Sequence, residues 1–148
     1  MKMKRKVSAP LVLEEAIWLF GDERVELESM LQRFLVEGFS YDEMSEVPDH
    51  LTAASATALA FILPRLIDEM ISRNDTASYM IFHVLTAFDP HQKNEILARR
   101  FSELNSMIDP ETVRKFLALV PLIKDNLPLE AERLAKACSY WEEWLTKH

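Results

Sequence analysis

The stretch from Thr52 to Phe88 constrains the fold most, because apolar residues recur along it at helical spacing. In its first half, steps of three and four place one set on a common face: Leu59, Leu63, Leu66, Ile67, Met70 and Ile71. After an interruption at residues 74–76, the same steps run through Ala77, Met80, Ile81, Val84, Leu85 and Phe88. Helices that are apolar nearly all round are usually buried all round. The stretch therefore predicts two antiparallel core helices onto which the rest of the chain packs.

Length and composition favour a single all-helical domain. The chain has 148 residues, 49% of them hydrophobic, which is enough to bury one sizeable core. Only two glycines are present, whereas hairpin sheets and phosphate-binding loops rely on glycine for positive φ. We therefore expect an all-α fold of six or seven helices over residues 10–148, preceded by a flexible basic tail over residues 1–9.

Local signals place the helix ends near the N-terminus. Pro10 suits the first position of a helix, because its missing N–H has no partner there in any case. We expect this helix to reach Phe20 and to end at Gly21. Asp22 is then expected to cap a second amphipathic helix.

Three proline sites bear on the later helices. Asp89–Pro90 and Asp109–Pro110 each combine a capping residue with a proline at the first helical position, so each predicts a helix start. Pro64 lies within the apolar stripe. It predicts either a kink in one long helix, which the unbroken stripe favours, or two short helices.

Few residues suggest catalysis or metal binding. The sequence contains no Glu-x-x-His pair, His-Glu-x-x-His motif, glycine-rich phosphate loop or Gly-x-Ser-x-Gly elbow. His91 and Glu95 have a spacing that suits a divalent metal, with Asp89 just upstream, but Asp89 is better explained as a cap. We therefore expect no catalytic residue, metal or cofactor. An enzyme would need a pocket that gathers His83, Tyr79 and carboxylates.

The same sequence argues against nucleic-acid and membrane partners. Apart from the short basic cluster at residues 4–6, adjacent basic residues occur only at 99–100 and 114–115, which does not make a basic face for phosphates. The longest uncharged stretch, residues 51–64, is shorter than the ~20 residues that span a bilayer. With one cysteine, Cys138, no internal disulfide forms, which favours a reducing, cytoplasmic location.

The acidic segment, from Glu37 to Asp49, is the candidate recognition surface. The net charge of −7 is concentrated before residue 51, and this segment holds five acids without a lysine or arginine. We read it as a connection with one short helical turn whose acids face solvent. Opposite charge steers partners together, and interleaved apolar residues can anchor them. The candidate partner-binding residues are Glu37, Phe39, Tyr41, Asp42, Glu43, Met44, Glu46 and Asp49.

Two short motifs run from Ala58 to Phe61 and from Leu63 to Arg65, and the expected C-terminal helix carries Tyr140 and Trp141. In this order, they resemble an uncharacterised family of small bacterial all-helical proteins. The resemblance implies a bacterial, cytosolic, non-enzymatic protein.

Taken together, these patterns predict a small acidic module that binds a basic protein partner, as an immunity or inhibitory protein does. One alternative is a structural or assembly protein that acts as a homodimer through an apolar helix face. A second alternative is an enzyme of unknown class.

Overall fold

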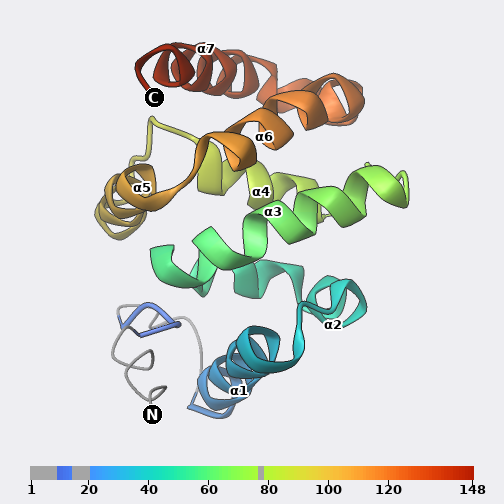
Figure 1. Ribbon diagram of the computed structural model, residues 1–148, viewed down its shortest axis with the longest axis vertical. Coiled ribbons are helices and arrows are strands. Elements are labelled where there is room, and N and C mark those ends of the chain that lie inside the picture. The colour runs from blue at the N-terminus through green and yellow to red at the C-terminus, as the bar shows by residue number, and fades with distance from the viewer. Residues whose placement is uncertain (1–9, 15–20, 77–78) are drawn as a thin grey trace.

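The computed structural model describes residues 10–14, 21–76 and 79–148, and it confirms an all-α fold. Its described helices are α1 (Gly21–Glu37), α2 (Tyr41–Glu46), α3 (Ala56–Ser72), α4 (Met80–Phe88), α5 (Glu95–Met107), α6 (Pro110–Ile123) and α7 (Ala131–Lys147), with 3-10 helices η2 (Pro48–Ala53), η3 (Lys124–Asn126) and η4 (Pro128–Glu130). Along the long axis, α1 and α2 form one end and α7 the other, with α3 crossing the middle (Figure 1).

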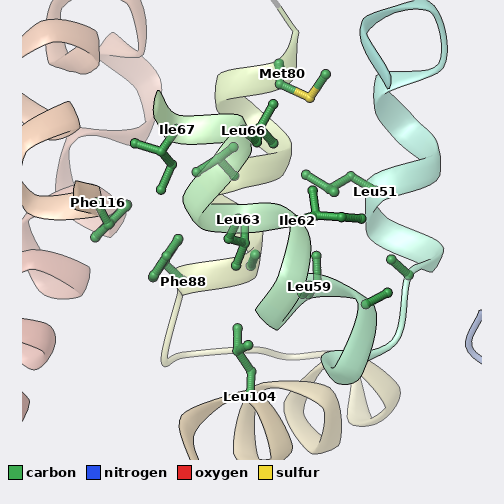
Figure 2. Close-up of a cluster of buried hydrophobic side chains, with 14 of the residues drawn as sticks. Leu51, Leu59, Ile62, Leu63, Leu66, Ile67, Met80, Phe88, Leu104 and Phe116 are labelled. Atoms are coloured by element: carbon green, nitrogen blue, oxygen red, sulfur yellow. The ribbon is translucent and has the colours of Figure 1, made fainter. Parts of the chain in front are cut away.

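Helix α3 is the centre of the core. The hydroxyl of Ser55 caps its start by accepting from the N–H of Ala58. The helix packs mainly against α5 and α6, while α4 returns behind it and packs mainly against η2 (Figure 1). Side chains from four helices meet at α3 (Figure 2), namely Leu59, Leu63 and Leu66 with Phe88, Leu104 and Phe116, all fully buried.

Pro64 lies inside one continuous helix, so the alternative of two short helices is wrong. A proline in a helix interior costs ~3 kcal/mol or more. Leu63 and Leu66 on either side of it have no exposed surface. Burying such side chains contributes roughly 1.5–3 kcal/mol each, so packing outweighs the lost hydrogen bond.

The expected helix from Pro10 is wrong for the residues that the structure describes. Val12 instead forms an isolated antiparallel bridge with Ala54, directly after η2. The N–H of Leu13 donates to the Ala53 carbonyl at 2.8 Å, and the N–H of Ser55 donates to the Leu11 carbonyl at 2.9 Å. Leu11 and Val12 are both buried in this pairing, whereas in a helix the side chains of two neighbouring residues would point in different directions. Residues 15–20 lie outside the described residues.

Gly21 belongs to α1 and does not end a helix with positive φ, so its expected capping role is wrong. Asp22 accordingly lies in the first turn of α1, where its negative charge suits the positive end of the helix dipole.

Of the two Asp–Pro pairs, only the second starts a helix. Asp109 accepts from the N–H of Thr112 at 2.8 Å, which confirms it as the cap of α6. Asp89 ends α4 instead, and α5 begins later, with Asn94 as its cap. Asn94 accepts from two backbone N–H groups, a stronger start signal than Asp89 offers. Asp89 is thereby left for another role.

We expect α3 to dominate stability. Changing Leu63 or Leu66 to Ala should lower the free energy of unfolding by ~2–5 kcal/mol, because burial is lost and a cavity remains. Leu129, which is 94% exposed, is the matched control, and its change to Ala should cost less than about 0.5 kcal/mol. Urea unfolding measures all three. Equal losses of stability in the core variants and the control variant would contradict the placement of α3 at the centre of the core.

Candidate functional site

A cleft of about 830 Å³ opens where five parts of the chain meet. Its walls come from η2, α4, the connection between α4 and α5, the first turn of α5 and the first half of α7. The lining residues are Asp49, Thr52, Phe82, His83, Thr86, Asp89, His91, Gln92, Lys93, Asn94, Leu97, Glu132, Arg133 and Lys136. Ligand pockets are typically about 300–1,000 Å³, so the cleft has the size of a small-molecule site.

An ion pair between Asp89 and Arg133 ties two of these walls together. The Arg133 Nε donates to Asp89 Oδ2 at 2.6 Å, and its Nη1 donates to Glu130 at 2.8 Å. The Asp89 side chain is buried, whereas that of Arg133 is 34% exposed. Partial burial opposes the guanidinium charge, but the hydrogen bonds that Arg133 donates to Glu130 and Asp89 raise its pKa overall. The pair fixes the end of α4 against α7.

His83 lies on a second wall and contacts η2. Its Nδ1 is 2.9 Å from the hydroxyl of Thr52. Burial lowers the pKa of His83, and the positive charge of Arg100 acts in the same direction, while Asp49 opposes the shift. The imidazole is therefore neutral at pH 7, and it can donate or accept a hydrogen bond.

Arg100 holds η2 in place without lining the cleft itself. Its Nη1 donates to the carbonyls of Leu51, Thr52 and Ala54, at 3.2, 2.9 and 3.1 Å. Burial lowers its pKa to about 10, so the guanidinium remains charged at neutral pH. No carboxylate of the described chain pairs with Arg100, and the backbone carbonyls take that role.

Two amide side chains that line the cleft, Gln92 and Asn94, each use one half of the amide to bind backbone. Gln92 Nε2 donates to the carbonyls of Thr86 and Asp89, at 2.7 and 2.9 Å. Asn94 Oδ1 accepts from the start of α5. The Gln92 carbonyl and the Asn94 amide have no further partner within the described ranges. These backbone bonds fix both side chains while an acceptor and a donor stay available.

The acidic segment is partly built into the fold. Tyr41 and Met44 are buried, so they are not the exposed anchors that the sequence suggested. Phe39 is half-buried and packs edge-on against Phe34, with ring centroids 5.1 Å apart. These residues hold the segment against the body, as its expected role as a connection implies.

The acids of this segment do face solvent, but two of them have partners. Asp42 pairs with Arg73 at 3.0 Å, and Glu43 pairs with Arg33. The other three, Glu37, Glu46 and Asp49, are exposed. The structure does not bring the set together: Asp49 lines the cleft, whereas Glu43 and Glu46 line a separate acidic groove of about 200 Å³.

Sequence reasoning singled out four residues of the cleft, Asp49, His83, Asp89 and His91, but in separate roles, and it missed the rest of the lining. The cleft gathers His83 with three carboxylates, Asp49, Asp89 and Glu132. Tyr79, the other residue that an enzyme was expected to need, is 80% exposed and does not line it. The one available signal was the density of polar residues from Asp89 to Asn94 between two helices, since connections between rigid elements often carry function.

Neither a cluster of metal ligands nor a helix able to span a membrane occurs within the described ranges. No group of three or more His, Cys, Asp or Glu there is placed to hold a metal ion. Asp89, in particular, binds Arg133 and the N–H of His91. No described helix has both the length and the apolar character needed to cross a membrane.

Comparisons with protein-family models, curated proteins and solved structures gave no match. The family resemblance therefore stays an expectation that rests on the short motifs that carry it.

Asparagine substitutions distinguish the two Asp–Pro sites. Asp89→Asn should lower the free energy of unfolding by about 1–3 kcal/mol, because Arg133 loses its buried, charged partner. The loss stays within this range because solvent screens the partly exposed Arg133 side chain. Asp109→Asn should cost less than about 0.5 kcal/mol, since an amide oxygen still caps α6. Urea unfolding at low salt measures both. If the two variants lose the same stability, Asp89 acts only as a neutral hydrogen-bond acceptor.

His83 should make stability fall in mild acid. Its folded-state pKa lies below the ordinary value of 6.5, so the unfolded chain takes up the proton first as pH falls through 6.5. Unfolding measured at pH 7.5 and 5.5 should show a smaller loss for His83→Gln than for the parent. His91→Gln, at an exposed histidine, is the control and should behave as the parent does. An unchanged pH dependence in His83→Gln would refute the burial effect.

Proposed function

We propose that this protein is a binding protein that holds a small organic molecule in the cleft between η2, α4 and α7. The observation that carries the proposal is the convergence of polar side chains from four chain segments on a partly apolar cavity of ligand size. Phe82 and Leu97 supply apolar surface, while His83, Gln92 and Arg133 supply fixed polar groups. Binding sites generally combine a mainly apolar wall with a few oriented polar groups.

Preorganisation supports binding at this cleft. The Asp89–Arg133 pair and the Thr52–His83 contact each join two of its walls. A wall that is already ordered costs less entropy when a ligand binds, so more of the contact energy appears as affinity.

We propose binding rather than catalysis. The Thr52–His83 contact has the distance of a hydroxyl nucleophile and its base. A working base also needs a third group that orients it, and no carboxylate of the described residues hydrogen-bonds the His83 ring. We also propose a cytoplasmic location, since a chain with one cysteine suits a reducing compartment.

A second candidate function is recognition of a basic protein, in the manner of an immunity or inhibitory protein. The acidic groove between α1, α2 and η2 favours it, because Glu26, Glu43 and Glu46 line it together with a single arginine, Arg33. A lysine or arginine side chain from a partner would fit its charge. The burial of Tyr41 and Met44 leaves this surface without the aromatic and methionine anchors on which protein interfaces rely.

An NMR titration tests the two candidates together. We expect a mixture of small organic fragments to shift backbone amide signals around Thr52, from Gln92 to Leu97, and around Arg133, since these segments form the cleft. A lysine-rich peptide serves as the comparison ligand, and it should leave those signals unchanged. If only the peptide binds, and it shifts signals around Glu26 and Glu46, the cleft proposal fails and protein recognition replaces it.

A further inference from the structure

The charges that line the cleft cancel one another. It contains three cationic and three carboxylate side chains, Lys93, Arg133, Lys136, Asp49, Asp89 and Glu132. Two of the cations are already paired with acids, Arg133 with Asp89 at 2.6 Å and Lys136 with Glu132 at 3.5 Å. A charged ligand would have to compete with these existing partners. The charge balance therefore favours a ligand without net charge.

One wall of the cleft consists of flat groups. Phe82 is 39% exposed, and the His83 ring stands edge-on to it with centroids 5.6 Å apart. The Arg133 guanidinium lies over one face of the Phe82 ring, 5.7 Å from its centre, so a planar ligand would stack on the face away from Arg133. Aromatic rings and guanidinium planes both stack on planar ligands. This wall therefore suits a planar ring better than a flexible chain.

The connection to α5 supplies hydrogen-bonding groups of both kinds. Gln92 has its carbonyl oxygen available and Asn94 its amide N–H₂, because the opposite half of each side chain is bound to backbone. A ligand that meets both must carry a donor and an acceptor on its edge. Heteroaromatic rings with an exocyclic amine or carbonyl have such an edge.

We propose that the cleft binds an uncharged planar heteroaromatic ring, with its face against Phe82 and its donor–acceptor edge against Gln92 and Asn94. The proposal rests on the binding role proposed above for the same cleft. It names the class of ligand by ring shape and hydrogen-bonding edge, and it applies equally to a free heterocycle and to the base of a nucleotide.

Titrations followed by amide NMR signals test this class with single probes. Adenine is the heteroaromatic probe, benzoate the anion, benzylamine the cation and cyclohexanol the non-planar control. Adenine should bind at least tenfold more tightly than each of the others and should shift signals from Gln92 to Leu97. Adenosine monophosphate should bind no more tightly than adenosine, because the lining offers no net positive charge.

Matched variants locate the ring. Stacking on an aromatic side chain corresponds to roughly 5- to 150-fold in affinity, so Phe82→Ala should lower the affinity for adenine by that factor. Phe61→Ala is the control, since Phe61 also carries an arginine over its ring, Arg65 at 3.9 Å, but lies away from the cleft. It should leave adenine affinity unchanged. Preserved dispersion of the amide signals verifies that each variant is folded.

The outcomes separate the two levels of the proposal. If benzoate or benzylamine binds in the cleft more tightly than adenine and loses affinity in Phe82→Ala, the heteroaromatic class is overturned while the binding role stands. Tighter, salt-dependent binding of adenosine monophosphate would likewise overturn the class in favour of anion recognition. If no probe shifts any cleft signal, both the ligand class and the binding role are overturned.

Discussion

A buried guanidinium bound to three backbone carbonyls is the contact on which the middle of this structure depends. Arg100 reaches from α5 to η2 and donates to Leu51, Thr52 and Ala54. Burying a charge is costly unless hydrogen bonds replace those of water. Here the carbonyls at the end of a short helix, which carry partial negative charge, supply the replacement. Arg100 thereby joins α5 to η2, which pairs in turn with residues 11–13.

The cleft follows from that arrangement and from one ion pair. With η2 held in place, α4 packs against it and Thr52 meets His83. At the other end of α4, Asp89 binds Arg133 and brings the start of α7 to the same side. The connection between α4 and α5 bridges these walls and carries the amide side chains. Two charged contacts between segments far apart in the sequence thus shape a cavity whose own lining has no net charge.

Helical periodicity predicted the fold class and the core, because spacing alone decides which side chains share a face. Leu63 and Leu85, for example, are fully buried as expected. The cleft was not predictable in this way, since its partners lie far apart in the chain. Asp89 followed by proline matches a helix start locally, but its partner Arg133 lies 44 residues away. Arg100 was missed because charged residues are rarely buried, so the sequence pattern places them outside.

Crystallographic soaking of a fragment library tests the central claim, that this cleft is where the protein binds its ligand, most directly. Fragments of all shapes and charges are offered at once, and their positions in the crystal are read without assuming a ligand class. We expect planar fragments to gather against Phe82, on the face of its ring away from Arg133. Fragments that gather in the acidic groove beside Glu26 and Glu46, with the cleft left without any, would contradict it.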